Sequence, residues 1–367
     1  MVDKRAFLSI MPIMDRKLAS IQKIISLEPI PGADAILVAQ VLGWKCVVKK
    51  EEFKVGDLCI YFEIDSILPI AQWNDHLRKG SEKDKPLRVR SIRLRGQLSQ
   101  GLALPIKGIL GDPIPVSDFS DDMDWKIDDD VTDLTGVKKY DPPIPIELSG
   151  VMKGNFPASI PKTDEMRLQT KPDLLSEVGD LPMVGTLKMD GASVTAYLKD
   201  GVFGVCSRRI DLVESETNAY WKAIRAISLE EKMRGYAMLT NTPNYSVQGE
   251  LCGPGIQGNK MGLSKIIIMF YNIYFIDSTT YGCTERLQEF CQINALQTVP
   301  VVFSGSLEAN LKTMTGILEF ASLLDYDNKT PAEGIVWRPQ EEKYSELLKG
   351  RLSFKTISSR FLLHYNE

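Results

Sequence analysis

The sequence predicts an α+β protein in which a small all-β barrel is joined to a larger domain of antiparallel sheets with helices. Three observations support this prediction. The chain has 367 residues, which exceeds the usual size of one domain. Its first hundred residues alternate between short β-rich runs and turn residues. Beyond Phe156, strand-like apolar runs alternate with stretches of helical periodicity.

Composition excludes several classes of protein. With 44% hydrophobic and 25% charged residues and no apolar run long enough to cross a bilayer, we expect no association with a membrane. The six cysteines form no Cys-x-x-Cys pair, and together with a start that lacks a signal-peptide core they indicate an intracellular protein. Two histidines leave little room for zinc or Ser-His-Asp chemistry, and a net charge of −4 argues against a uniformly basic surface.

The first domain is expected to span residues 1–110. Its strand-like runs fall at 18–24, 36–41, 46–49 and 58–64, separated by turns such as Val55-Gly56-Asp57. Short strands at this spacing favour a partly open Greek-key barrel, and the segment resembles an OB fold, a common oligonucleotide-binding barrel. Alternating arginines from Arg88 to Arg95 lie on one face of a further expected strand, where they either follow phosphates or simply face solvent.

Residues 111–155 are acidic and rich in proline, which predicts an extended linker. The domain that follows, residues 156–367, is expected to contain strands at 245–251, 266–274, 333–338 and 352–357. Helices are expected at 218–232, 285–296 and 311–324, and Asp164 is expected to cap a short helix that presents Arg167.

Lys188 has an unusual position for a lysine, because it follows the apolar run Leu181–Val184 and comes two residues before Asp190. One interpretation is a nucleophile whose amine is made neutral by burial and a nearby cation. The other is a surface lysine in a hairpin turn closed by Asp190-Gly191. The local pattern alone does not separate the two.

Further charged motifs follow Lys188 in a fixed order. They are Ser207-Arg208, Gly249-Glu250-Leu251, Phe270-Tyr271-Asn272-Ile273, Glu333-Gly334-Ile335-Val336 and Phe354-Lys355. The series resembles the covalent nucleotidyltransferase superfamily of ATP-dependent ligases and RNA capping enzymes. Two segments, Lys162–Gln169 and Gly249–Gln257, are similar to those of RNA-sealing ligases. Because the barrel precedes the lysine, the whole arrangement resembles the RNA ligase 5 type, which has an amino-terminal OB domain.

This resemblance implies an RNA-binding OB domain followed by an adenylyltransferase domain of antiparallel, ATP-grasp-like sheets. It also implies an ATP-dependent RNA ligase that joins 3′-hydroxyl and 5′-phosphate RNA ends through a covalent lysyl-AMP intermediate. The expected cofactors are ATP and magnesium or manganese. We expect a monomer that acts on nicked duplex RNA.

The resemblance also implies a role for each motif. Lys188 is the expected nucleophile, and Asp190, Glu250 and Glu333 are the expected metal ligands. The residues expected to contact the nucleotide are Leu187, Lys188, Arg167, Arg208, Glu250, Tyr271 and Lys355. Tyr271 is expected to stack on adenine, with Phe270 as the alternative if the strand register differs by one.

One departure from the family pattern concerns the last motif. RNA ligases of this superfamily often have a second lysine two residues from the first, whereas Ser353 and Ile357 flank Lys355 here. Arg351 and Arg360 are the candidates for its replacement. Two other functions are considered, a DNA ligase of the same superfamily and an RNA-binding protein with a catalytically silent ligase fold. The absence of a carboxy-terminal OB domain argues against the first, and the intact lysine and carboxylates argue against the second.

Overall fold

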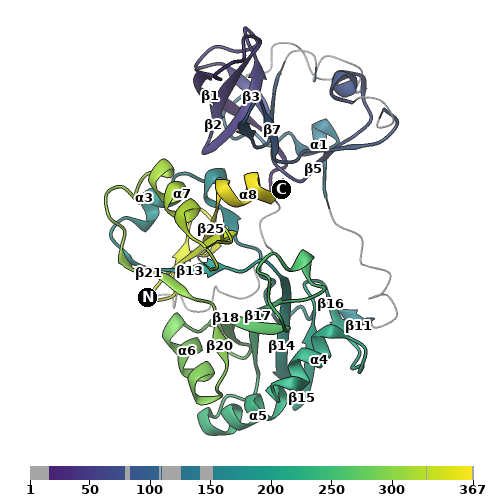
Figure 1. Cartoon of the computed structure of the whole chain (residues 1–367), viewed down its shortest axis with the longest axis vertical. Helices are drawn as coiled ribbons and strands as arrows, with labels where there is room; N and C mark the ends of the chain where they lie inside the picture. Colours follow the sequence, from purple (N-terminus) through teal and green to yellow (C-terminus); the bar gives the residue numbers. More distant parts are fainter. Residues whose placement is uncertain are drawn as a thin grey trace, which may run out of the picture. The chain divides into compact units, whose positions relative to one another are not determined.

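The computed structural model describes residues 16–78, 83–106, 109, 125–140, 152–327 and 329–365. These residues form two compact units, coloured by sequence in Figure 1. The barrel unit comprises the described residues up to Tyr140, the short segment Leu168–Pro172 and the C-terminal helix α8 (Ser359–Tyr365). The two-sheet unit comprises residues 152–167 and Asp173–Ser358.

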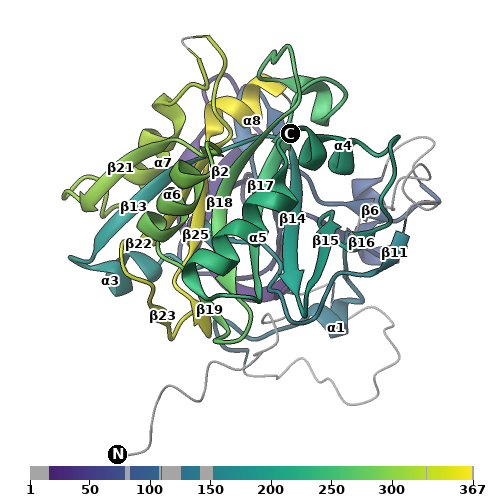
Figure 2. The same ribbon diagram turned by 90° about the horizontal axis from the view of Figure 1, so that it is seen from below.

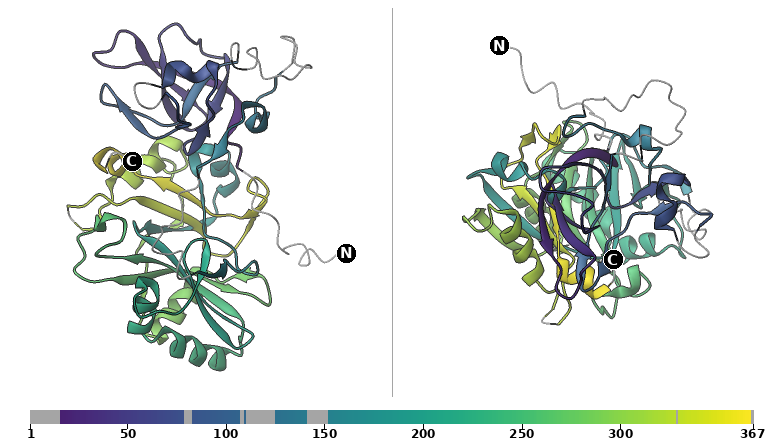
Figure 3. Two further views of the ribbon diagram at one scale, coloured as in Figure 1. Left: turned by 90° about the vertical axis from the view of Figure 1, so that its right-hand side faces the viewer. Right: turned by 90° about the horizontal axis from the view of Figure 1, so that it is seen from above.

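The barrel unit is organised around β1 (Ala19–Pro29), the longest of its strands. A bulge between Ile24 and Ser26 bends β1, so that its first half pairs with β4 (Leu58–Phe62) and its second half with β2 (Ile36–Val41). β3 (Trp44–Lys49) and β9 (Leu102–Pro105) complete the antiparallel order β3-β2-β1-β4-β9. The strands bury an apolar cluster on each face, since Cys59 and Tyr61 of β4 belong to one cluster and Ile60 and Phe62 to the other. Figure 3 shows these curved strands in purple and blue, and the arrangement agrees with the predicted OB-like barrel.

The sequence predicted a single strand for the arginine-rich stretch, but the structure has two separate short strands there. β6 (Leu87–Arg88) pairs with β5 (Ser66–Leu68), whereas β7 (Ile92–Leu94) forms a separate hairpin with β8 (Gln97–Ser99). Arg88 bonds to Asp65 at 2.6 Å and lies over the ring of Tyr140, 3.6 Å from its centroid, so it stabilises the barrel. The other arginines of the stretch, Arg90, Arg93 and Arg95, are exposed.

Part of the expected linker is folded into the barrel unit. α1 (Thr132–Thr135) and β10 (Lys138–Lys139) lie in it, and β10 pairs with β5. Val131 and Val137 are buried against Ile21 and Ile60, because these two valines interrupt the acidic sequence with apolar side chains. The aspartates at positions 112–124 lie outside the described residues.

The two-sheet unit contains a larger and a smaller sheet. The larger has the order β11-β16-β15-β14-β17-β18-β19, with β20 also paired to β18. Its strands are β11 (Met152–Asn155), β14 (Ala192–Lys199), β15 (Val202–Cys206), β16 (Ile210–Leu212), β17 (Tyr245–Cys252), β18 (Ile267–Phe275), β19 (Thr280–Tyr281) and β20 (Gln297–Thr298). The smaller has the order β12-β25-β22-β13-β21. Its strands are β12 (Met166–Arg167), β13 (Pro182–Lys188), β21 (Val301–Ser306), β22 (Gly334–Pro339) and β25 (Phe354–Ile357).

Helices cover one face of the larger sheet, as Figure 2 shows for α5 and α6. α4 (Ala219–Ala226), α5 (Leu229–Thr240) and α6 (Thr284–Ile293) bury residues such as Trp221, Leu229 and Phe290 against it. α7 (Met314–Leu323) packs on the smaller sheet, where Phe320 contacts Phe303 and Trp337. The remaining short elements of this unit are α3 (Leu174–Val178), η5 (Gln257–Asn259), β23 (Tyr344–Ser345) and β24 (Gly350–Arg351).

Two predicted helices differ from the observed elements. The helix expected at 218–232 is divided, because Ser228 has a φ of 49° between α4 and α5. Asp164 caps no helix, since residues 161–165 have no regular secondary structure and lead directly into β12. All six cysteines are free thiols, as expected for a protein without a disulfide framework. None of the helices described is both long enough and apolar enough to span a bilayer.

Candidate active site

The smaller sheet brings several predicted site residues together. Lys188 is the last residue of β13 and lies opposite Gly334, the first residue of β22. Glu333 directly precedes Gly334 in the chain. Lys188 Nζ donates a hydrogen bond of 2.6 Å to Glu333 Oε2. On the other side of β22, Lys355 of β25 pairs with Val336, and Arg167 of β12 pairs with Lys355. Leu187 is buried in a small apolar cluster beneath the lysine.

The larger sheet provides the other predicted residues. Glu250 lies on β17 opposite Ser193, and Arg208 follows β15. On β18 the register places Phe270 in the core under the helices, where it is fully buried, whereas Tyr271 contacts the apolar cluster around Leu187. The pairing of β18 with β17 is irregular here, because Gln248 lies opposite Asn272 and Gly249 opposite Phe270. The contact of Tyr271 with the cluster around Leu187 therefore identifies it as the aromatic residue on the side of Lys188.

The connection from Lys188 to β14 is not the hairpin turn that the sequence allowed. β13 belongs to the smaller sheet and β14 to the larger, so Met189–Gly191 passes from one sheet to the other. At Gly191, an added Cβ would lie 2.4 Å from the Leu251 carbonyl oxygen and 2.9 Å from Glu250 Cγ. The glycine is therefore required because β17 approaches the backbone closely, and this approach brings Glu250 toward Lys188.

Charges within the site control the protonation of Lys188 and Glu250. Burial acts to lower the pKa of Lys188, but Glu333 and Glu250 outweigh it and hold the pKa above its ordinary value. Sequence reasoning considered burial and a neighbouring cation, which favour a neutral amine, and the structure adds the carboxylates, which act in the opposite direction. Burial, together with Glu333 and Asp190, raises the pKa of Glu250 to about 8.

Lys355, rather than Lys188, has the lowered pKa. Burial brings the pKa of Lys355 down to about 8, and the nearby charges of Lys188 and Arg167 act in the same direction. Asp164 opposes them, since its Oδ1 lies 3.5 Å from Lys355 Nζ. Two lysines of different protonation behaviour therefore lie close together in one site.

The carboxylates Asp190, Glu250 and Glu333 have the chemistry of a magnesium or manganese site. Glu333 and Asp190 both raise the pKa of Glu250, because like charges repel one another. A divalent cation would offset this repulsion. Within the described ranges of the chain, no three acidic, histidine or cysteine side chains converge closely enough to hold an ion directly. Carboxylates of this kind commonly hold magnesium through its bound water molecules.

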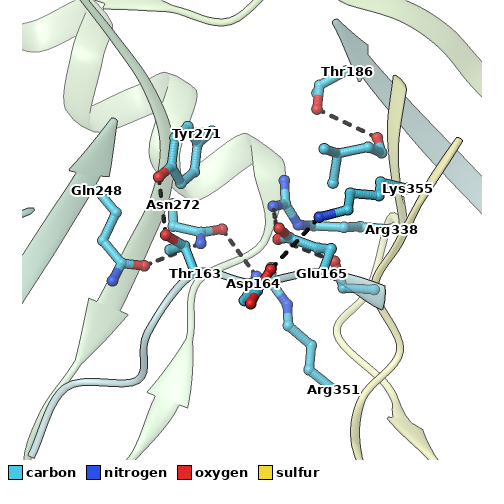
Figure 4. A network of polar contacts seen from close by, with 12 residues as sticks. Thr163, Asp164, Glu165, Thr186, Gln248, Tyr271, Asn272, Arg338, Arg351 and Lys355 are labelled. Carbon is cyan, nitrogen blue, oxygen red and sulfur yellow. Dashed lines mark hydrogen bonds and ion pairs between the residues drawn. The ribbon is translucent and has the colours of Figure 1, made fainter. Parts of the chain in front are cut away.

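The segment Thr163–Glu165 crosses the site between the sheets, as Figure 4 shows. Tyr271 Oη donates a hydrogen bond of 3.2 Å to Thr163 Oγ1. Glu165 Oε1 accepts one of 2.6 Å from Arg338 Nη2. Between them, Asp164 contacts Lys355 and also Arg208 Nη2, the latter at 3.1 Å. The sequence assigned Arg167 to the site but no function to Thr163, Asp164 or Glu165, although the surrounding segment was similar to the RNA-ligase pattern.

A third lysine of the site, Lys260, was missed by sequence reasoning. Lys260 Nζ lies 3.2 Å from Asp190 Oδ2, and both side chains are largely buried. Lys260 follows the glycine-rich turn after β17. Because it is far from Asp190 in the chain, the sequence gives no sign of this contact. Tyr326 is a further addition, since its hydroxyl donates to the carbonyl of Lys188 at 2.8 Å and accepts from the amide of Glu333 at 3.1 Å.

Arg351 has contacts of its own away from Lys355. It bonds to Asn272 Oδ1 at 2.9 Å and to Glu342 Oε2 at 2.7 Å, and it lies over the ring of Tyr281. Arg360, the other candidate for the missing lysine, belongs to α8 in the barrel unit. Arg351 therefore links the β23–β24 hairpin to β18 and β19 of the larger sheet.

Comparisons with known proteins identify the family. A family model described as RNA ligase matches residues 181–357, and one described as OB-fold domain matches residues 18–106. No curated protein matches the chain significantly. Among solved structures, the Naegleria gruberi RNA ligase with PPi is 36% identical, with a TM-score of 0.78 over 96% of this chain and 99% of that one.

Two further structures of the Naegleria gruberi ligase are similar to the same extent. A lysine-to-methionine variant with AMP and Mn is 35% identical, with a TM-score of 0.79 over 96% of this chain and 99% of that one. A lysine-to-alanine variant with ATP and Mn is 35% identical, with a TM-score of 0.79 over 95% and 99%.

The fold therefore combines an OB-fold barrel with the catalytic fold of covalent nucleotidyltransferases. The chain belongs to the RNA ligase family and is an RNA ligase, as the order of its motifs predicted. Neither a DNA ligase nor a silent binding protein is favoured by these matches.

Proposed function

We propose that this ligase uses ATP to seal RNA in three steps, two transfers of AMP followed by its release. Lys188 Nζ attacks the α-phosphorus of ATP, forms the N–P bond and loses its proton as pyrophosphate leaves. AMP then passes from Lys188 to a 5′-phosphate of RNA. Finally, a 3′-hydroxyl attacks that phosphate, which forms the phosphodiester and releases AMP. The position of Lys188 beside Glu333, with Glu250 and Asp190 close by, is the observation that carries this proposal.

The roles of the other residues follow from their chemistry. Phosphoryl transfer depends mainly on positioning and charge neutralisation, which suits a site without histidine. Lys355, Arg208 and Arg167 bind phosphate oxygens, and Tyr271 stacks on adenine above Leu187. Glu250 is the candidate acceptor for a ribose hydroxyl.

Asp190, Glu250 and Glu333 would hold magnesium or manganese. A divalent ion held there would offset the carboxylate charge that keeps Lys188 protonated and would neutralise phosphate oxygens. Structures of the Naegleria gruberi ligase with ATP and Mn and with AMP and Mn support both ligands for this chain. Lys188, once neutral, is the nucleophile.

The barrel unit supplies RNA binding in this proposal. Its exposed arginines, Arg90, Arg93 and Arg95, carry positive charge that would bind the phosphates of a duplex. A nick in duplex RNA is the proposed substrate. We place the boundary between the two domains between Tyr140 and Met152, because α1 and β10 of the expected linker belong to the barrel unit, and we propose that the enzyme acts as a monomer. Six free thiols support an intracellular location.

Labelling with ATP tests the covalent step. Wild-type protein incubated with α-labelled ATP and magnesium should retain AMP covalently, and Lys188→Ala should lose the label. Lys312→Ala is the matched control, because Lys312 pairs with Asp180 on the surface of the same unit and should leave labelling intact. Label that persists in Lys188→Ala would contradict the assignment of the nucleophile.

The substrate is tested with nicked duplexes that differ only in the strand carrying the 3′-hydroxyl. We expect an RNA strand at that position to be sealed much faster than a DNA strand. Equal rates would mean that the enzyme does not read the sugar at the nick, and the RNA assignment of the substrate would then be wrong.

A further inference from the structure

Asp164 contacts two cations that the proposed function assigns to phosphate. Its Oδ1 lies 3.5 Å from Lys355 Nζ and its Oδ2 lies 3.1 Å from Arg208 Nη2. Lys355 comes from the smaller sheet, whereas Arg208 follows a strand of the larger sheet. One carboxylate therefore bridges two cations from different sheets, and both cations are phosphate ligands in the proposed function.

A carboxylate and a phosphate compete for cations of this kind, since both offer negatively charged oxygens to ammonium and guanidinium groups. The two contacts of Asp164 are moderate in length, and its side chain is 36% exposed. Arg208 is more exposed still, at 59%. Partly exposed ion pairs of this kind contribute little to stability, so a phosphate can replace the carboxylate in both contacts.

The residues on both sides of Asp164 are held more firmly. Thr163 Oγ1 accepts from Tyr271 Oη and is 3.2 Å from Ser193 Oγ. Glu165 bonds to Arg338 at 2.6 Å, and Arg338 is itself 5% exposed. Burial acts to raise the pKa of Glu165, but Arg338 outweighs it, so the pKa is lowered and the buried pair stays ionised. The segment is thus anchored at Thr163 and Glu165, and Figure 4 shows the Asp164 carboxylate directed toward Lys355.

We propose that Asp164 is an internal competitor for the nucleotide phosphate. In the nucleotide-free enzyme its carboxylate holds Lys355 and Arg208 in position, and the α-phosphate of AMP or ATP replaces it when the nucleotide binds. This inference rests on the proposed function, because it takes Lys355 and Arg208 as phosphate ligands.

The proposed exchange has a consequence for turnover. Each nucleotide that binds must displace Asp164, so the net affinity of the enzyme for nucleotide phosphate is lower than its two cations would otherwise give. Free AMP is the product of the last step, and a weaker hold on its phosphate favours its release. Asp164 would thereby act as a positioning residue for the empty site and limit inhibition by product.

Calorimetric binding of AMP and adenosine to Asp164→Asn tests the proposal. The protein is first treated with pyrophosphate and magnesium to remove covalent AMP, its mass is checked, and EDTA is added. Because Asp164 raises the pKa of Lys355, binding is measured at about pH 6.5, below that pKa of about 8, so that the lysine stays charged. We expect AMP to bind about three- to tenfold more tightly, and adenosine to bind equally, since only AMP carries the competing phosphate.

Asp180→Asn is the matched control, because Asp180 also pairs with a lysine, Lys312, in the same unit. It should change neither affinity. Thermal unfolding of both variants checks that the fold is retained. AMP affinity that is unchanged or weaker in Asp164→Asn overturns the proposal, since removing a residue that only positions the two cations would weaken binding.

Lys355→Ala and Arg208→Ala separate this proposal from the function on which it rests. If both weaken AMP binding while Asp164→Asn has no effect, the phosphate ligands are correct and the competition is not. If neither weakens AMP binding, the assignment of the phosphate ligands itself is wrong.

Discussion

At the residue scale, the pKa of Lys355 leads to a pH-dependent prediction for nucleotide binding. Burial lowers this pKa to about 8, so the ammonium loses its proton as the pH rises through that value. Phosphate binds the ammonium form, and AMP affinity should therefore be full below about pH 7 and fall by at most about tenfold per unit above pH 8. Binding titrations of AMP between about pH 6.5 and 9.5 measure this fall.

Lys355→Arg is the control for that titration. A guanidinium keeps its charge throughout the range, so the variant should show no decline above pH 8 even if its overall affinity differs. A decline of the same size in both proteins would assign the titration to another group.

The charged groups of the site were recognisable in the sequence, but their mutual effects were not. Lys188, Glu250, Glu333 and Lys355 each belong to a motif, and the structure brings them together. The direction of the pKa shift of Lys188 was not predictable, because it depends on which carboxylates lie beside a buried amine. Lys260 was missed for the same reason, since its interaction with Asp190 joins residues far apart in the chain.

At the element scale, hydrophobic periodicity predicted the strands of both units well. Apolar residues at alternate positions form the buried face of a strand, so the sequence pattern indicates the strand directly. The connections were less predictable. Asp190-Gly191 has the composition of a hairpin turn, yet it joins two sheets, and the close approach of β17 to Gly191 is a tertiary contact. The break at Ser228 has no glycine or proline to indicate it, and Ile224 and Leu229 on either side are both fully buried.

The register of β18 predicts opposite consequences for two neighbouring aromatic residues. Phe270→Ala should lower the free energy of unfolding by about 3–5 kcal/mol, because the ring lies in the core beneath the helices. Tyr271→Ala should instead weaken adenosine binding by about 1–3 kcal/mol, the usual value of stacking a base on an aromatic ring. Denaturant unfolding and adenosine titration of both variants distinguish the two effects, and each variant serves as the control for the other.

A register shifted by one residue would exchange the two results. Phe270→Ala would then abolish adenosine binding, whereas Tyr271→Ala would have the larger effect on stability. That outcome would place Phe270 at the nucleotide, as the alternative interpretation of the sequence allowed.

At the scale of the whole molecule, the order of the two folds was predictable but their exact membership was not. The barrel unit includes Leu168–Pro172 and α8, and Gly43 donates a backbone hydrogen bond of 2.9 Å to Gln169 within it. Val131 and Val137, from the expected linker, complete its core. Such assignments depend on burial of a few apolar residues from distant segments, which a scan along the chain does not reveal.

This composition of the barrel unit determines how its role in RNA binding is best tested. Removing residues 1–110 would leave Val131 and Val137 without Ile21 and Ile60, so substitutions at the surface are cleaner than a deletion. Arg90 and Arg95 are exposed, unlike Arg88, and Arg93 donates a hydrogen bond to the Leu363 carbonyl. We therefore choose the double substitution Arg90→Ala and Arg95→Ala.

The double variant should seal nicked RNA about tenfold more slowly at low salt and label itself with AMP at the normal rate, because every residue assigned to the nucleotide lies in the two-sheet unit. The slope of RNA affinity against salt should fall by about two, one for each arginine–phosphate pair removed. Lys49→Ala with Lys50→Ala removes two exposed cations elsewhere in the same unit and is the matched control. If the control variant reduces sealing as much as the double variant does, the arginines contribute only general charge. If self-labelling of the double variant falls together with sealing, the barrel unit acts on the nucleotide step as well.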